Sequence, residues 1–310
     1  MEIIHSITDF IPTQKTFVTI GTFDGVHIGH QKIIEKLVKE AEKSNRKSVV
    51  LTFFPHPRMV LQKDTTIKLI NTIEERAALL EKTGLDYLII HPFSKSFSRL
   101  TALEFVRDLL VNRLHISKLI IGYDHHFGKN REGNIEQLSE YAQVYDFDVE
   151  EIPAQDIDEV SVSSTKIRKA LEFGALKTAN KYLGYAFSFT GTVVNGKQLG
   201  NTIGFPTANI HIKESYKLIP KTGVYIVESH FNKKTVYGIM NIGIRPTVNG
   251  GDQTIEVHFL NFSENLYGKS LTIKVLYFLR DECKFDSVNA LKKQLQNDEL
   301  LARKYIKNNL

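Results

Sequence analysis

The stretch that most constrains the fold is Phe17–His30, which reads FVTIGTFDGVHIGH. Its apolar and β-branched beginning predicts a buried strand that ends at Gly21, and the glycines and Asp24 that follow mark a tight turn before an amphipathic helical pattern. His27 and His30 lie three residues apart at the start of that helix, so both rings can face an anion held by the exposed N–H groups. The stretch predicts a phosphate site, most simply for a nucleotide; the alternative is an ordinary strand–turn–helix connection.

The first part of the chain alternates between strand and helix patterns. Strand patterns lie at 17–21, 49–54, 87–93, 118–123 and 148–152, and helical patterns at 28–44, 73–83, 102–114 and 135–145. Two helices begin with capping-box spacing, Thr72 with Glu75 and Thr101 with Glu104. The alternation predicts an α/β domain, a parallel sheet covered by helices on both faces. The segments 21–30, 54–58 and 122–128 each follow a strand, so we expect them to meet at the carboxyl edge of the sheet.

The pattern changes after Gly184. Six closely spaced β-branched and aromatic runs follow, at 187–194, 208–212, 223–231, 235–243, 254–260 and 271–279. They predict an antiparallel barrel or sandwich, and two helical patterns, 288–296 and 299–307, end the chain. We therefore expect two domains, 1–184 and 185–310.

Composition narrows the class of protein. The 310 residues carry a formal net charge of +5, which mildly favours anionic ligands such as nucleotides. No basic tail or stripe of Lys and Arg indicates a nucleic-acid partner. The single cysteine, Cys283, excludes an intramolecular disulfide. The N-terminus lacks a signal-peptide pattern and no run approaches the roughly 20 apolar residues of a membrane span, so we expect a cytoplasmic protein without a membrane partner.

Three more segments of the first domain carry candidate chemistry: TFFPHP at 52–57, GYDHHFGKNREGN at 122–134 and SSTKIRKAL at 163–171. The last places three hydroxyls at a helix start with Lys166 and Arg168 in its first turns, which suits a second anion site or, equally, a capped surface helix. With the opening stretch, which matches G-x-F-D-G-x-H-x-G-H, these segments resemble in type and order the adenylyltransferase domain of the prokaryotic bifunctional riboflavin kinase/FAD synthetases.

The resemblance implies a Rossmann-like domain in which the phosphate of FMN attacks the α-phosphorus of ATP and pyrophosphate leaves, with positioning and charge neutralisation supplying most of the catalysis. It implies catalytic roles for His27 and His30. It implies nucleotide binding by Gly21, Phe23, Asp24, Gly29, Ser164, Thr165 and Arg168, and flavin binding by His56, Asp124 and His125. Relatives often carry an aromatic residue where this chain has His125-His126, so the partners of Asp124, His125 and His126 stay open. Histidine spacing does not indicate a structural zinc site.

In the second domain, GTVVNGKQ at 191–198 nearly spells a P-loop. Gln198 replaces the magnesium-binding hydroxyl and no helix pattern follows, so we interpret it as a strand and a glycine turn. The segment GFPTANI at 204–210 is more informative, because Thr207 and Asn209 offer hard oxygen ligands of the kind that Mg²⁺ prefers. Without context it is a turn before a strand.

Segments 241–247, 255–262 and 278–285 follow in an order that resembles the riboflavin kinase domain of the same family, a six-stranded β-barrel. The resemblance implies that Thr207 and Asn209 bind Mg·ATP, that Glu256 is the general base on the ribityl 5′-hydroxyl, and that Arg245 and Arg280 bind the flavin. From the residues alone, Glu256 is also an outward position of an alternating strand, and Arg280 a solvated charge.

The function implied by the two halves is flavin cofactor synthesis with Mg²⁺. Riboflavin and ATP give FMN and ADP in the C-terminal domain, and FMN and ATP give FAD and pyrophosphate in the N-terminal domain. The alternatives are a chain with one active domain and a non-enzymatic flavin- or RNA-binding protein. The expected partners are riboflavin, FMN, FAD and ATP, and the sequence does not indicate an oligomeric state.

Overall fold

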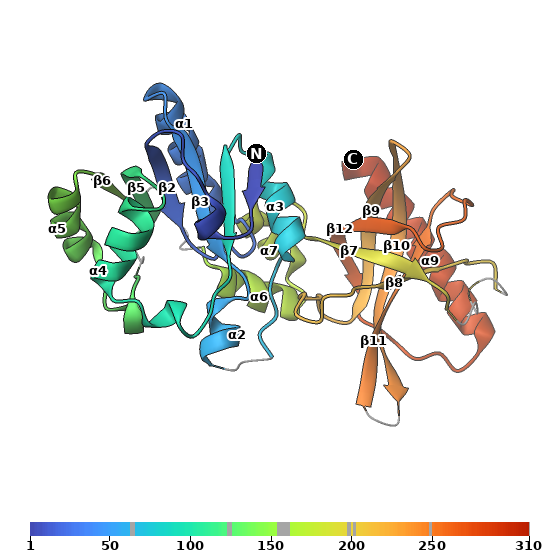
Figure 1. The fold of residues 1–310 in the computed structure, drawn as a ribbon. Coiled ribbons are helices and arrows are strands. Elements are labelled where there is room, and N and C mark those ends of the chain that lie inside the picture. The colour runs from blue at the N-terminus through green and yellow to red at the C-terminus, as the bar shows by residue number, and fades with distance from the viewer. Residues whose placement is uncertain are drawn as a thin grey trace. The chain divides into compact units, whose positions relative to one another are not determined.

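The computed structural model describes residues 1–62, 66–122, 126–153, 162–196, 200, 203–247 and 250–309, with the backbone alone at 131, 245–247 and 250–252. The chain divides into two compact units, Met1–Ser164 and Thr165–Leu310 (Figure 1).

The first unit contains a six-stranded sheet in the order β1-β4-β3-β2-β5-β6, with every pair of neighbours parallel. The strands are β1 (Glu2–Ile4), β2 (Thr16–Ile20), β3 (Lys47–Phe53), β4 (Tyr87–His91), β5 (Ile116–Gly122) and β6 (Asp148–Ile152). The predicted parallel α/β architecture is confirmed. Only the three-residue edge strand β1 carried no pattern that predicted it.

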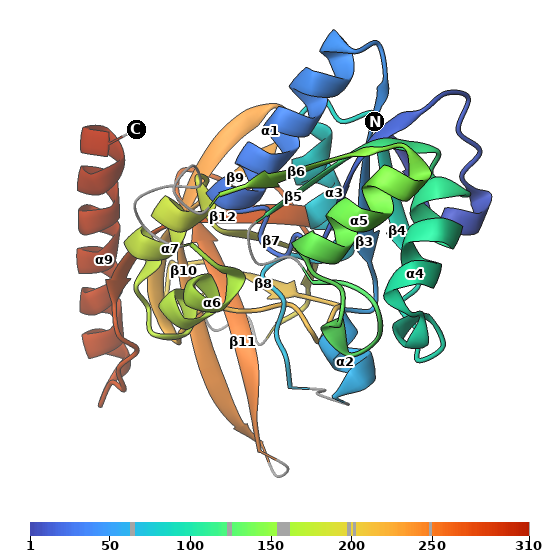
Figure 2. The same cartoon turned by 90° about the vertical axis from the view of Figure 1, so that its left-hand side faces the viewer.

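Helices cover both faces of this sheet, with α1 and α5 on opposite sides (Figure 2). One face packs against α1 (Ile28–Lys43) and α3 (Ile73–Glu81), the other against α4 (Ala102–Glu104), its continuation η3 (Phe105–Val111) and α5 (Ile135–Tyr145). Both predicted capping boxes form, at Thr72–Glu75 and at Thr101–Glu104. The short α2 (Pro57–Leu61) was not predicted, and η3 is π-helical, which a hydrophobic period does not reveal.

Two helices join the barrel, α6 (Ser164–Glu172) and α7 (Leu176–Leu183). Asn180 of α7 donates a hydrogen bond to the carbonyl of Val275 and accepts one from the N–H of Phe187, and the carbonyl of Leu171 accepts one from the N–H of Lys221. These bonds explain why the compact second unit begins ahead of Gly184, where the change of sequence pattern places the boundary.

The second unit is a closed antiparallel barrel in the order β10-β11-β8-β7-β12-β9. The strands are β7 (Ser188–Val194), β8 (Ala208–His211), β9 (Gly223–Phe231), β10 (Lys234–Thr247), β11 (Gly250–Phe259) and β12 (Ser270–Arg280). Ile226 and Ile239 of the barrel pack against Ala302 of the last helix, α9 (Val288–Asn309). The prediction of a six-stranded barrel is confirmed.

The expectation of two C-terminal helices is wrong, because α9 is one continuous helix of 22 residues. Asn297 and Asp298 lie between the two helical patterns, 288–296 and 299–307, and both are part of this helix. Asp298 is completely buried and forms an ion pair with Arg280 at the end of β12, 2.7 Å between Oδ2 and Nη2, so its polarity serves a contact between α9 and the barrel.

Candidate active sites

The turn after β2 is built around a buried carboxylate. Both oxygens of Asp24 accept hydrogen bonds from the N–H of Ile70, at 3.0 and 3.2 Å, and one accepts a third from the N–H of Asn71 at 3.2 Å. Gly25 has φ +87°, and a Cβ there would lie 2.9 Å from Cδ1 of Ile70. The turn therefore needs this glycine, both for its left-handed backbone and for its close packing.

His27 and His30 meet at the start of α1, as their spacing predicted. His27 is the N-cap of the helix, and its Nδ1 accepts a hydrogen bond from the N–H of His30 at 3.4 Å. The two rings stack with 3.5 Å between centroids, and Phe23 packs edge-on against His30 at 5.1 Å. This arrangement gathers two imidazoles at a helix N-terminus, where anions are favoured.

The electrostatics keep His30 uncharged. Burial, then the neighbouring His27 and then Arg76, lower the pKa of His30 well below 6.5. Its Nδ1 is buried and, among the described residues, has no hydrogen-bond partner. A neutral imidazole with an unused polar atom can bind a phosphate oxygen, and the negative charge of that phosphate would raise its pKa again.

The other segments of the first unit follow strands of the same sheet. The segment that contains His56 comes directly after β3, and Nδ1 of this buried residue caps α2 by accepting from the N–H of Arg58 at 3.2 Å. Oγ of Ser164 donates a hydrogen bond to the carbonyl of Asp24 at 2.8 Å, so the beginning of the segment 163–171 contacts the turn after β2. Asp124 and His125 lie outside the described residues, and Thr165 and Arg168 belong to the second unit. Gly21 directly follows β2, and Gly29 lies in the first turn of α1.

In the barrel, three polar side chains of the expected kinase site come together. Glu256 of β11 pairs in register with Asn209 on β8. Oγ1 of Thr207 donates a hydrogen bond to Oε2 of Glu256 at 3.4 Å. Gly196 lies directly against the carboxamide of Asn209, so a side chain at position 196 would displace it. The hydroxyl of Thr207, just before β8, the carboxamide of Asn209 on β8 and the carboxylate of Glu256 on β11 thus lie close together.

Sequence reasoning missed His258, two positions beyond Glu256 and so on the same face of β11. Its Nδ1 lies 2.8 Å from the carbonyl of Pro206, and its ring packs edge-on against Phe205 at 5.3 Å. These contacts hold the segment that carries Thr207. The period of two could have identified His258 as a neighbour of Glu256.

The two arginines expected at the flavin differ in what can be described. The side chain of Arg245 lies outside the described residues. Arg280 is not a solvated charge: its Nε and Nη2 bond both carboxylate oxygens of Asp298, and its Nη1 donates to the carbonyl of Asp281 at 2.9 Å. The hydrogen bonds from Arg280 to Asp298 raise the pKa of this arginine. Arg280 therefore ties the end of β12 to α9.

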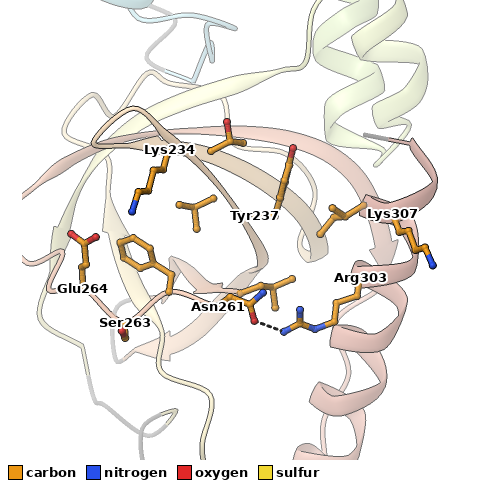
Figure 3. A pocket seen from close by; sticks show the side chains of 12 residues that line it. Lys234, Tyr237, Asn261, Ser263, Glu264, Arg303 and Lys307 are labelled. Carbon is orange, nitrogen blue, oxygen red and sulfur yellow. Dashed lines mark hydrogen bonds between the residues drawn. The ribbon is translucent and has the colours of Figure 1, made fainter.

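A pocket of about 530 Å³ lies elsewhere on the second unit, between the beginning of β10, residues 260–264 and the end of α9 (Figure 3). Arg303 spans it to Asn261 with a hydrogen bond of 2.9 Å. None of the residues expected in either active site lines this pocket. Its lining is mainly exposed, and we do not assign it to the chemistry.

Comparisons with known proteins cover nearly the whole chain. The FAD synthetase family model matches residues 11–166, and the riboflavin kinase model matches residues 183–306. A bifunctional riboflavin kinase/FMN adenylyltransferase of Buchnera aphidicola is 38% identical, covering 97% of both chains. The protein of the same description from Escherichia coli K12 is 37% identical, covering 97% of this chain and 96% of that one.

A solved structure shares the fold of the entire chain. A crystal structure from Streptococcus pneumoniae, described as a macrolide-efflux protein, superposes with a TM-score of 0.89 at 31% identity, covering 97% of this chain and 98% of that one. In the parts of the chain that the structure describes, no helix has the length and hydropathy needed to cross a membrane. Because both family models match in this order and the relatives match over nearly the full length, the chain belongs to the family of bifunctional riboflavin kinases/FMN adenylyltransferases.

Proposed function

We propose that the chain makes FAD from riboflavin in two ATP-dependent steps, each in its own unit. The observation that carries this proposal is that each unit contains a separate polar centre: the stacked pair His27–His30 in the first, and the Thr207–Glu256 contact in the second. Their chemistries differ in the way the two reactions require. Adenylyl transfer needs charge stabilisation at phosphates, whereas phosphorylation of an alcohol needs a base that orients the hydroxyl.

In the second unit, Glu256 accepts the proton of the ribityl 5′-hydroxyl as that oxygen attacks the γ-phosphorus of ATP, and ADP leaves. A carboxylate beside the hydroxyl is a sufficient base, because orientation of the nucleophile contributes more to phosphoryl transfer than its full deprotonation. Thr207 orients Glu256 through the 3.4 Å contact between them. Arg245 and Arg280 belong to the flavin side of this site in our proposal, with Arg280 acting through the segment it holds.

The donors beside Glu256 also suit a magnesium ion. The hydroxyl of Thr207, just before β8, and the carboxamide oxygen of Asn209, two positions on, are hard oxygen ligands, and the carboxylate of Glu256 opposite adds negative charge. We infer that Thr207 and Asn209 hold Mg²⁺ with ATP. When bound, the ion neutralises charge on the ATP phosphates.

In the first unit, His27 and His30 bind the phosphates of ATP while a phosphate oxygen of FMN attacks the α-phosphorus and pyrophosphate leaves. No protein nucleophile takes part. Gly21, Phe23, Asp24 and Gly29 shape the turn that receives the nucleotide, and Ser164, which bonds the carbonyl of Asp24, completes its binding within this unit. Nucleotide binding by Thr165 and Arg168 stays a prediction from the resemblance. His56, Asp124 and His125 are proposed for the flavin side.

The test separates the two reactions in one purified chain. Riboflavin or FMN is supplied with ATP and Mg²⁺, and the products are separated by chromatography. We expect His30→Ala to abolish FAD formation from FMN while it retains FMN formation from riboflavin, and Glu256→Gln to do the reverse. If either variant keeps both activities, the assignment of sites to units is wrong.

The same assay decides between the alternatives. A chain with one active unit stops at FMN, or acts on FMN but not on riboflavin. A flavin- or RNA-binding protein without catalysis turns over neither substrate and would bind RNA in a salt-sensitive manner.

A further inference from the structure

A buried cation lies beside the turn that carries the adenylylation site. Arg76 of α3 is 1% exposed, and its Nη2 lies 3.7 Å from Oδ1 of Asp24, whose side chain is also 1% exposed. Its Nη1 donates to Oγ1 of Thr52 at 3.4 Å, and Thr52 donates in turn to the carbonyl of Thr22 at 3.2 Å. Arg76 thus reaches the turn in two ways, through a carboxylate and through a hydroxyl.

The carboxylate of Asp24 connects this turn to the helix that carries Arg76. It accepts from the N–H groups of Ile70 and Asn71, directly before the N-cap Thr72 of α3. A buried carboxylate without a cation would be costly, and Arg76 supplies the cation. The turn, the start of α3 and the guanidinium therefore form one closed network.

The turn needs such an external hold. Phe23 and Val26 have φ values of +48° and +36°, in a region that residues with side chains rarely adopt and that strains a β-branched residue most. Both residues are buried, at 3% and 2% exposed. Strained backbone persists only where its surroundings determine it, and the contacts of Asp24 are those surroundings.

Arg76 also acts on His30 electrostatically. Apart from His27, the charged group that lowers the pKa of His30 is Arg76, after the larger effect of burial. Phe23 and His27 of the turn pack against the ring of His30, and the charged group on α3 that acts on it is Arg76, which pairs with Asp24. A cation in this position adds to burial and to His27 in disfavouring the charged form of His30.

We propose that Arg76 is a positioning residue for adenylyl transfer, which holds the turn 21–27 through Asp24 so that His27 and His30 are presented to the phosphates. It acts through these residues and does not itself touch the substrate. The inference rests on the proposed role of His27 and His30.

The test uses the full chain and measures kcat and KM for FAD formation from FMN, with riboflavin phosphorylation in the same sample as an internal control. The variants are Arg76→Met, Arg76→Lys, Asp24→Asn and the double variant Arg76→Met with Asp24→Asn. Arg107→Met is the matched control, since Arg107 is half-exposed and pairs with its neighbour Asp108. Thermal unfolding of each variant is followed by calorimetry.

We expect Arg76→Met to lower kcat of FAD formation about tenfold or more, since small displacements of catalytic groups have effects of this size. Arg76→Lys should recover part of the loss, and riboflavin phosphorylation should stay within about twofold of the wild type. The double variant should lose less than the product of the two single losses, because the two residues share the Arg76–Asp24 contact. The acid limb of the pH profile should move to higher pH in Arg76→Met and stay in place in Arg107→Met.

Two results would overturn the inference: an unchanged kcat in Arg76→Met, or losses in the double variant that multiply. If Arg76→Met does not fold, the double variant decides, because it leaves no unpaired buried charge; a wild-type kcat there refutes the inference. His30→Ala in parallel separates this failure from that of the proposed site. If His30→Ala keeps FAD formation, the proposed adenylylation site is wrong. If His30→Ala loses FAD formation and the Arg76 variants keep it, only the positioning role of Arg76 is wrong.

Discussion

Replacing Asp298 with alanine should destabilise the second unit through the charge it leaves behind. Asp298 is fully buried, and Arg280 bonds it at 3.0, 3.2 and 2.7 Å with only 22% of the arginine side chain exposed. Gln294 adds a fourth bond to the same carboxylate at 2.8 Å. Asp298→Ala therefore leaves a guanidinium and an amide without their acceptor in a largely buried position.

The expected cost follows from that burial. Removing one partner of a buried ion pair costs about 3 to 5 kcal/mol, and the partial exposure of Arg280 places Asp298→Ala near the lower value. For a unit of this size, about 3 kcal/mol corresponds to a fall of roughly 6 to 12 °C in the melting temperature.

Calorimetry of the full chain measures this effect, with the transition of the second unit identified by its upward shift on addition of ATP and riboflavin. Asp281→Ala is the matched control, because Asp281 is a carboxylate of the neighbouring segment whose side chain is 70% exposed and pairs with Lys221. We expect less than about 0.5 kcal/mol from that control. Equal shifts in the two variants would refute the reasoning that the Arg280–Asp298 pair holds α9 on the barrel.

Two further predictions concern the first unit. Gly25→Ala should lower the stability of this unit by about 1 to 3 kcal/mol and reduce FAD formation, because a Cβ would lie 2.9 Å from Ile70. Gly84→Ala is the control, since Gly84 also has a positive φ but the atom nearest to an added Cβ is 3.6 Å away. An equal loss of FAD formation in Gly84→Ala would contradict this prediction. The pKa of His30 is lowered in the folded chain, by burial first. Below about pH 6.5 the unfolded chain therefore binds a proton at this histidine that the folded chain does not. As the pH is lowered through this range, the free energy of unfolding should fall by at most about 1.4 kcal/mol per pH unit. His30→Gln should flatten this dependence in denaturant titrations between about pH 7 and pH 5; an unchanged slope would show that another group titrates.

Local patterns predicted most of the elements, because their causes are local. The strand β2 is buried along its entire length and is bounded by a glycine turn, and Thr72 and Thr101 form their caps with residues three positions on. Even the stacking of His27 on His30 follows from a spacing within one helical turn. In these cases the residues that decide the structure are neighbours in the chain.

What escaped prediction depends on contacts between distant residues. The burial of Asp298 in α9 depends on Arg280, which pairs with it from 18 positions away. His258 is held by the carbonyl of Pro206, 52 positions away. The role of Arg76 rests on Asp24, and a charge in an amphipathic helix gives no indication that it is buried. Each of these requires the tertiary fold before its purpose can be inferred.

The two sheets differ in how they deal with unpaired strand edges, and this bears on aggregation. The closed barrel has no edge at which a strand of another molecule could add. The parallel sheet ends in β1, which is three residues long, and in β6, whose sequence DVEEI carries three carboxylates. Short and charged edges resist pairing between molecules, so a chain with two β-rich units presents little template for intermolecular sheet growth.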